Sequence, residues 1–278
     1  MTKSAINELT AKEWLYRSKS VISKSFSIHE DAWRIRSLNK ACKPPQLCKS
    51  IVETFSLKDD IVFDPFAGTG GVVLGTQLAG RKVLGCEINA DYIRAYRLAC
   101  VEMAGLFGSF DAEAIKHAYF GKKPSIQDSN LEALGPLVDG SIGMVFTDPP
   151  YFDMDSRPKS KRWWKDKGSQ ARPMEQFGSG LHYKSIDDWE SCMASFASGS
   201  FLAARNRAYA VCFMEDMYIE GKYVFLTHRL ASVMESVGWI PQGEYIWHNE
   251  ARRPGFFGYP SRMITNRTHT SILFFRKE

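Results

Sequence analysis

Two acidic residues and a glycine-rich loop stand at the ends of successive predicted strands. A strand predicted at 61–63 runs directly into the segment Asp64-Pro65-Phe66-Ala67-Gly68-Thr69-Gly70, and a helix follows. Glycines let the backbone approach a ligand closely, and the first turn of a helix presents free N–H groups. Glu87 ends the next predicted strand, where a carboxylate can accept hydrogen bonds from both ribose hydroxyls of an adenosine. The pattern predicts an adenosine site, with a surface glutamate as the alternative; it leaves NAD open and disfavours a P-loop, whose Gly-Lys-Ser/Thr ending is absent.

A rigid acidic corner follows a later strand. The run Asp148-Pro149-Pro150-Tyr151 comes directly after a hydrophobic strand predicted at 143–147. Two prolines fix the backbone and remove two N–H donors, so the nearby carbonyls become rigid acceptors. With the Asp148 carboxylate and the flat face of Tyr151, such a corner suits a planar group that bears an exocyclic NH2. Hydrogen bonds to that nitrogen would free its lone pair for attack on an activated methyl placed in line. A rigid turn with a buried tyrosine is the structural alternative.

Positive charge is concentrated in one segment. Residues 157–172 hold seven basic side chains and one acid, whereas the net charge of the whole chain is +5. The adjacent Trp163 and Trp164 add aromatic planes on which bases can stack, beside cations that can displace counterions from phosphates. A solvated loop with two tryptophans packed on the core is an equally weighted alternative. A second basic tract, at 17–43, is more dilute.

The predicted elements that position these residues alternate between strands and helices. Further strands are predicted at 82–86, 125–127, 208–214, 245–247 and 271–275. The capping-box spacing of Thr10 and Glu13 predicts a short helix there, and the polar sequence that follows it, to about residue 40, is predicted to be a loop or arm. Further helices are predicted from Pro44-Pro45 through Phe55, up to Ala79, from the Asn89 cap to Gly105, at 188–204 and at 224–237. This alternation predicts a mostly parallel sheet that is covered on both faces.

Composition bounds the class of protein. The chain has 278 residues, 44% hydrophobic and 24% charged, which predicts a folded domain with a sizeable core. We expect no membrane span and no signal peptide, because no stretch has the required apolar length. The six cysteines are scattered and include no C-x-x-C pair. This pattern argues against a zinc site and is typical of reduced thiols in a cytoplasm.

Taken together, these motifs resemble the S-adenosylmethionine-dependent DNA amino-methyltransferases, which methylate N6 of adenine or N4 of cytosine. Segment 64–70 is similar to their methionine-binding motif, 85–89 to the segment with the ribose-binding acid, and 148–151 to their catalytic tetrapeptide. Segment 44–47 resembles the helix opening that closes over the methionine end, and 127–129 the segment whose acid contacts the adenine. The resemblance implies an α/β, Rossmann-like methyltransferase fold with a mostly parallel seven-stranded sheet and helices on both faces. We expect a single domain over 1–278, with an N-terminal arm at 1–42 and a basic insertion at 152–185 as a candidate target-recognition loop.

The resemblance also implies roles for individual residues. Catalysis falls to Asp148, Pro149, Pro150 and Tyr151. Binding of the cofactor S-adenosylmethionine falls to Pro45, Asp64, Pro65, Phe66, Ala67, Gly68, Thr69, Gly70, Glu87, Ile88, Asn89, Asp128 and Ser129. Nucleic-acid contacts are expected from Lys159, Lys161, Arg162, Trp163, Trp164, Lys165, Arg252 and Arg253, and no metal is expected.

The expected activity is site-specific methylation of adenine N6 in DNA, with the target base flipped out of the duplex. Adenine is favoured over cytosine because an aspartate leads the tetrapeptide, where cytosine-N4 enzymes of the family commonly have a serine. N4-cytosine DNA methylation, methylation of a base amine in RNA and a catalytically silent nucleic-acid-binding module are the alternatives. The resemblance implies a cytoplasmic protein of bacterial, archaeal or phage origin, and leaves open a companion restriction endonuclease or a homodimer.

Overall fold

The structure is a computed structural model, and it describes residues 5–26, 42–118, 140–152, 183, 185–219, 221–250, 252 and 260–278. The helices are α1 (Ala11–Arg17), α3 (Pro45–Phe55), α4 (Gly71–Leu78), α5 (Ala90–Phe107), α7 (Ile186–Ala203) and α8 (Leu226–Val237). The strands are β1 (Val21–Ser23), β2 (Ile61–Asp64), β3 (Lys82–Glu87), β4 (Ile115–His117), β5 (Ile142–Thr147), β6 (Ala204–Met214), β7 (Met217–Ile219), β8 (Lys222–Val224), β9 (Ile240–His248) and β10 (His269–Arg276).

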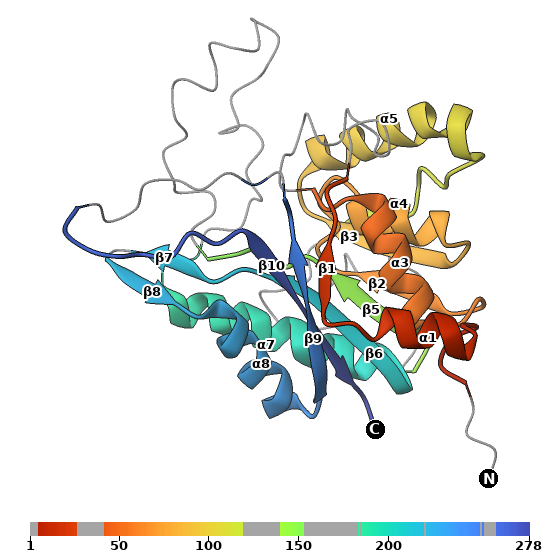
Figure 1. Cartoon of the computed structure of the whole chain (residues 1–278). Helices are drawn as coiled ribbons and strands as arrows, with labels where there is room; N and C mark the ends of the chain where they lie inside the picture. The colour runs from red at the N-terminus through yellow and green to blue at the C-terminus, as the bar shows by residue number, and fades with distance from the viewer. Residues whose placement is uncertain are drawn as a thin grey trace, which may run out of the picture.

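One large twisted sheet organises the chain (Figure 1). Its strand order is β1-β9-β10-β6-β5-β2-β3-β4, and β10 is antiparallel to both of its neighbours, whereas the other described pairs are parallel. Strands β7 and β8 form a separate two-stranded hairpin. The α/β fold with a mostly parallel sheet is therefore confirmed.

The predicted number of strands, seven, is wrong, because the large sheet has eight. The additional strand is β1, which lies in the segment expected to be an irregular arm and pairs in parallel with the edge strand β9. Side chains of β9 also bind the chain on either side of β1. The Tyr245 hydroxyl donates to the Arg17 carbonyl at 2.6 Å, and the Trp247 indole N–H donates to the Lys24 carbonyl at 3.0 Å.

Helices cover the two faces of the sheet, as Figure 1 shows. Alternate residues of the central strands point to opposite faces, as the two-residue period of a strand requires. Val62 and Met144 pack with α3 on one face, whereas Phe63 and Val145 pack with α7 and α8 on the other. β5 is buried along its whole length, which explains why its sequence is a continuous apolar run.

Most other predicted elements are confirmed to within a few residues, and the exceptions have local causes. Helix α5 continues through Gly105 and ends at Gly108, whose φ of 94° only glycine adopts readily. The strand that pairs with β3 is β4, at 115–117, whereas the predicted strand at 125–127 lies outside the described residues. The β7–β8 hairpin before α8 was not predicted. Within the described residues, no helix is both long and apolar enough to cross a membrane.

The contact between α3 and α4 generates a stability prediction. Gly75 of α4 faces α3 so closely that an added Cβ would lie 2.4 Å from the Cys48 Cβ and 2.6 Å from the Pro45 carbonyl oxygen. We expect Gly75→Ala to lower the free energy of unfolding by roughly 1–3 kcal/mol, measured by urea denaturation, because the two helices must separate.

Gly105→Ala is the matched control, since a Cβ there meets nothing within 4 Å. Its exposed position in α5 predicts a gain of about 0.5–1 kcal/mol from helix propensity. Equal effects of the two substitutions would contradict the close packing at Gly75.

Candidate active site

The glycine loop joins β2 to α4 in a conformation that glycine makes accessible. Gly70 has a φ of 86°, which other residues rarely adopt, and a Cβ there would lie 2.3 Å from the ring of Tyr96. Both the backbone conformation and the lack of space therefore require glycine. The loop is closed by hydrogen bonds from the Ala67 N–H to the Cys86 carbonyl and from the Gly70 N–H to the Ala67 carbonyl, both 2.8 Å. Backbone N–H groups at the start of α4 therefore face the edge of the sheet.

Glu87 ends β3 beside this loop. Its carboxylate accepts hydrogen bonds from the backbone N–H of Gly68 and of Asn89, both at 2.7 Å, and the side chain is 8% exposed. Burial raises the pKa of the Glu87 carboxyl to about 7, although the two backbone bonds oppose the shift. Asn89 caps α5 through a bond from the Asp91 N–H, as predicted. Glu87 thus fixes the loop against the strand edge while remaining close to its ionisation point at neutral pH.

Asp64 ends β2 and is almost fully buried. It accepts hydrogen bonds from the Thr147 hydroxyl at 2.7 Å and from the Phe66 N–H at 3.2 Å. Burial raises the pKa of the Asp64 carboxyl to about 7, with smaller opposing contributions from these two bonds. Because Thr147 is the last residue of β5, this bond connects the glycine-loop strand to the strand that carries the acid–diproline run.

The acid–diproline run lies at the same edge and is locked by three side chains. The Tyr151 hydroxyl donates to Asp148 Oδ1 at 2.9 Å, and the Lys43 ammonium donates to Asp148 Oδ2 at 2.7 Å and to the Tyr151 oxygen at 3.1 Å. The indole N–H of Trp189, in α7, donates to the Pro150 carbonyl at 2.9 Å. Burial raises the pKa of the Asp148 carboxyl, whereas the charge and hydrogen bond of Lys43 oppose that rise.

Lys43 and Glu215 are site residues that the sequence analysis did not identify. Lys43 immediately precedes the diproline that opens α3, and its side chain is 8% exposed. Glu215 directly follows β6, in the position that Asp148 has after β5. A carboxylate after a central parallel strand was the available signal for Glu215, whereas no local signal connects Lys43 with Asp148.

Glu215 is held by a network of its own. It forms a two-pronged ion pair with Arg252, both bonds 3.0 Å, and accepts a hydrogen bond from the Thr270 hydroxyl at 2.6 Å. Burial opposes ionisation of Glu215, but Arg252, Lys43 and Thr270 outweigh it and keep the pKa of this carboxyl below its usual value. Glu215 is therefore a fixed negative charge beside the Asp148 corner.

The structure brings most of the predicted site residues to one edge of the sheet. Pro45 begins α3 and is buried, and the Ile88 carbonyl contacts Nε2 of His117 at 2.7 Å. Arg252, expected to contact nucleic acid, pairs with Glu215, and its predicted role stays a prediction. The remaining predicted residues lie outside the described part of the chain: Asp128, Ser129, Lys159, Lys161, Arg162, Trp163, Trp164, Lys165 and Arg253. Among the described residues there is no group of three or more side chains suited to hold a metal ion.

Parts of the chain are similar to known methyltransferases. A family model described as DNA methylase matches residues 7–98. The tRNA (guanine(10)-N2)-dimethyltransferase of Methanocaldococcus jannaschii is 26% identical over 149 residues, which cover 53% of this chain and 36% of that protein. The DNA adenine methyltransferase YhdJ of Escherichia coli is 47% identical over 55 residues, which cover 19% of this chain and 18% of that protein.

A similar fold is found in a TehB-like SAM-dependent methyltransferase from Corynebacterium glutamicum, with 12% sequence identity and a TM-score of 0.46 over 89% of this chain and 96% of that one. The chain spans only about a third or less of the length of the two curated relatives. The family match and the similarity to YhdJ agree with the motifs at the sheet edge. These matches support a relationship of the chain to the S-adenosylmethionine-dependent amino-methyltransferases.

Proposed function

We propose that this protein transfers a methyl group from S-adenosylmethionine to N6 of adenine in DNA. The observation that carries the proposal is the position of the Asp148-Pro149-Pro150-Tyr151 corner. It lies at the same sheet edge as the glycine loop and Glu87, and the bond between Thr147 and Asp64 joins the two halves. Ligands of open α/β sheets bind at this edge, beyond the carboxyl ends of the strands.

The glycine loop and Glu87 suit the adenosine and methionine parts of the cofactor. The Glu87 carboxylate already accepts two backbone bonds and has lone pairs left for ribose hydroxyls. In the loop, Thr69 Oγ1 is buried without a hydrogen-bond partner among the described residues, which is a polar group suited to a bound ligand. The bound cofactor supplies a methyl group activated by its sulfonium centre.

The acid–diproline corner suits the amine that receives the methyl group. An aromatic amine is a poor nucleophile because its lone pair is delocalised into the ring. Ionised Asp148 accepts a hydrogen bond from the amino group and stabilises the positive charge that grows on nitrogen during transfer. The Pro150 carbonyl is fixed by Trp189, which holds the diproline backbone in place, and the Tyr151 ring supplies a face for the base.

Lys43 holds the place of the target amine before the base arrives. Its ammonium donates to Asp148 Oδ2, and it lies 5.3 Å from the centre of the Tyr151 ring and 5.2 Å from that of Phe213. The target amine is proposed to take the same position, with its nitrogen hydrogen-bonded to Asp148 beside the Tyr151 ring. Lys43 therefore keeps Asp148 ionised in the partly desolvated corner, and its ammonium withdraws from Oδ2 when the amino group enters.

RNA methylation is the second candidate function. It is favoured by the alignment to the tRNA (guanine(10)-N2)-dimethyltransferase, which is the longer of the two alignments to curated proteins reported above. DNA is favoured by the DNA methylase family model and by the name of the E. coli relative. Methylation of cytosine N4 uses the same corner and stays an alternative, as do a companion endonuclease and a homodimer.

Methyl transfer by the purified protein tests the function. With radiolabelled S-adenosylmethionine, we expect transfer to unmethylated duplex DNA and little to tRNA, and nucleoside analysis should identify N6-methyladenine. Asp148→Ala should lower the rate by roughly 100- to 1,000-fold and leave cofactor binding nearly intact, because only the acceptor of the amine is lost. Asp91→Ala, which removes a half-buried partner of the exposed Arg94, is the control. N2-methylguanosine in tRNA, or full activity of Asp148→Ala, would contradict the proposal.

Substitution of Lys43 should move the pH profile of kcat/KM. Transfer needs ionised Asp148, so the rate falls as the pH drops through the pKa of that carboxyl. Lys43→Met removes the charge that lowers this pKa, and the acidic limb of the profile should therefore shift to higher pH. Lys43→Arg keeps the charge and should leave the limb near its original place. An unchanged profile in Lys43→Met would refute the assigned role.

Cofactor affinity should depend on pH through Glu87. Because burial holds its pKa near 7, the carboxyl becomes protonated below that pH and loses acceptor capacity for the ribose hydroxyls. We expect the Kd for S-adenosylmethionine, measured by calorimetry, to rise as the pH falls from 8 to 6.

Glu87→Gln should raise that Kd by roughly tenfold and flatten its pH dependence, the residual slope coming from Asp64. Glu113→Gln, at an exposed residue that pairs with Arg97, is the matched control. A pH dependence that is as steep in Glu87→Gln as in the wild type would contradict the assignment.

A further inference from the structure

The β7–β8 hairpin leaves the sheet at the edge that carries the candidate active site. β6 pairs in parallel with β5, with Cys212 opposite Thr147, and the chain continues through Glu215 and Asp216 into the hairpin. Asp216 accepts bonds from the N–H and the hydroxyl of Thr227, at 2.9 and 2.7 Å, which fixes the start of α8 against the hairpin. The hairpin is thus anchored close to the Asp148 corner without being part of it.

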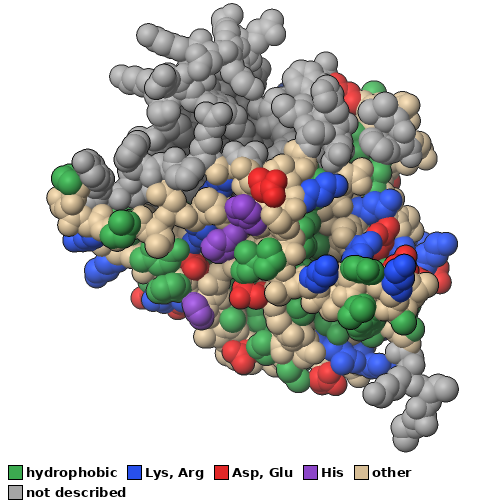
Figure 2. All heavy atoms as spheres, viewed as in Figure 1, with side chains coloured by type: hydrophobic (Ala, Val, Ile, Leu, Met, Phe, Trp, Pro, Cys, Tyr) green, Lys and Arg blue, Asp and Glu red, His purple; other side chains and the backbone are tan. Residues whose placement is uncertain are grey.

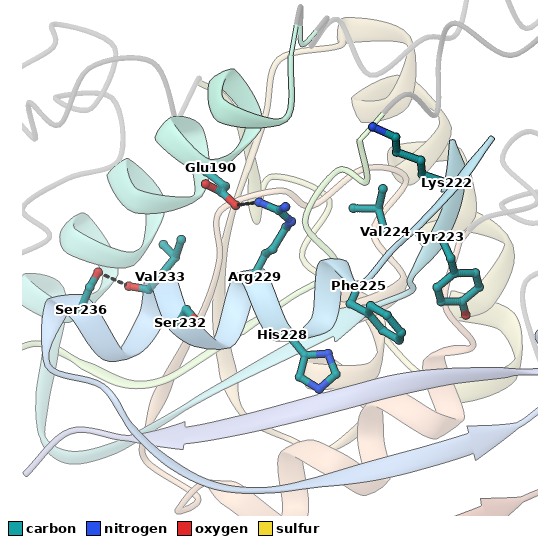
Figure 3. Close-up of a pocket in the computed structure, with 10 residues that line it drawn as sticks. All are labelled: Glu190, Lys222, Tyr223, Val224, Phe225, His228, Arg229, Ser232, Val233 and Ser236. Atoms are coloured by element: carbon teal, nitrogen blue, oxygen red, sulfur yellow. Dashed lines mark hydrogen bonds and ion pairs between the residues drawn. The ribbon is translucent and has the colours of Figure 1, made fainter. Parts of the chain in front are cut away.

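Three aromatic side chains form a row on this hairpin and on the first turn of α8. The Phe225 ring lies 5.0 Å from that of Tyr223 and 5.3 Å from that of His228, centre to centre, and both contacts are edge-on (Figure 3). Phe225 is 52% exposed and Tyr223 is 36% exposed. They border a groove of about 680 Å³ that runs along α8. Because the rings meet edge to face, part of each flat surface is left open for another planar group.

The charges around this aromatic row are mainly positive. Lys222 and Arg262 are exposed, and neither forms an ion pair with an acid in the described part of the chain. Arg262 donates to the Tyr218 hydroxyl at 3.0 Å and to the Gly221 carbonyl at 3.1 Å, so its partners in the described part of the hairpin are neutral. Arg229, on the groove wall, pairs with Glu190. Figure 2 shows hydrophobic and basic side chains side by side over this part of the molecule.

Exposed aromatic rings beside unneutralised cations match the chemistry of a nucleic-acid strand. Bases stack on aromatic faces, whereas lysine and arginine contact phosphates. A protein partner that covered the rings would meet Lys222 and Arg262 with no paired acid from the described part of the chain, so a polyanion is the better electrostatic match. The hairpin follows β6 at the edge of the sheet that carries the corner proposed to hold the target amine, so a strand bound to the hairpin would lie at the same edge.

We propose that the row Tyr223–Phe225–His228, with Lys222 and Arg262, binds the DNA strand that carries the target base, by stacking on nucleotides beside that base and by contacting its phosphates. The inference rests on the proposed function for the identity of the strand. The contacts themselves require only that the protein binds nucleic acid.

Binding of a fluorescent single-stranded DNA of mixed sequence, followed by anisotropy over a salt series, tests the surface. We expect Phe225→Ala to raise the Kd roughly tenfold, and Phe225→Trp to restore most of the affinity because it restores a stacking face. Lys222→Gln should lower the slope of log Kd against log salt by about one.

Tyr16→Ala is the matched control, because Tyr16 is 58% exposed on α1 and has a lysine over its ring, as an aromatic–cation pair away from the hairpin. Thermal unfolding of each variant, together with calorimetric binding of S-adenosylmethionine, distinguishes loss of the surface from loss of the fold. The inference would be overturned if Phe225→Ala bound DNA like the wild type or lost no more affinity than Tyr16→Ala. It would also be overturned if the wild type bound tRNA more tightly than DNA and Phe225→Ala removed that preference.

The methyl-transfer assay separates this inference from the proposed function. If the wild type methylates DNA and Phe225→Ala binds and methylates it equally well, the hairpin surface is refuted and the function stands. If the wild type binds DNA through Phe225 but transfers no methyl group to it, the function is refuted and the surface stands.

Discussion

Four acidic side chains lie at the ends of neighbouring strands at one edge of the sheet. Because they are partly or fully buried, each needs hydrogen-bond or ion-pair partners, and these partners make up most of the surrounding site. Asp64 accepts hydrogen bonds from Thr147 and from a backbone N–H, and Glu87 accepts two from backbone N–H groups, yet burial raises the pKa of each carboxyl to about 7. Asp148 depends on Lys43, and Glu215 on Arg252. Because parallel strands end at the same edge, the topology that covers the sheet with helices also gathers these charges. The partners of each acid then determine whether its carboxyl is ionised near neutral pH.

The parts of this site that the sequence predicts are those whose signal is local. Glu87 and Asp148 follow strands and belong to short motifs, so residue type and spacing are enough to place them. Lys43 could not be assigned in this way, because it reaches Asp148 across 105 residues of chain and no motif joins the two. The eighth strand has the same explanation, since three residues of ordinary composition become a strand only by pairing with β9, more than 220 residues later. Local pattern predicts where a strand ends, whereas tertiary structure decides which side chain meets it there.

The two halves of the site are mechanically joined as well as adjacent. Thr147, the last residue of β5, donates to Asp64, the last residue of β2, so a displacement of either strand is transmitted to the other. The glycine loop and the acid–diproline corner follow these residues directly. A methyl donor and an acceptor held on such strands have a separation fixed by the sheet, which is the condition under which proximity lowers a barrier most.

The Pro150 carbonyl accepts a hydrogen bond from the indole of Trp189, a fully buried side chain of α7 in the helical layer that covers the sheet. The prolines restrict the backbone of the corner, and the bond from Trp189 connects that backbone to the helical layer. The orientation of the corner therefore depends on the packing of α7. Substitutions that repack α7 would change the angle between the Asp148 corner and the glycine loop.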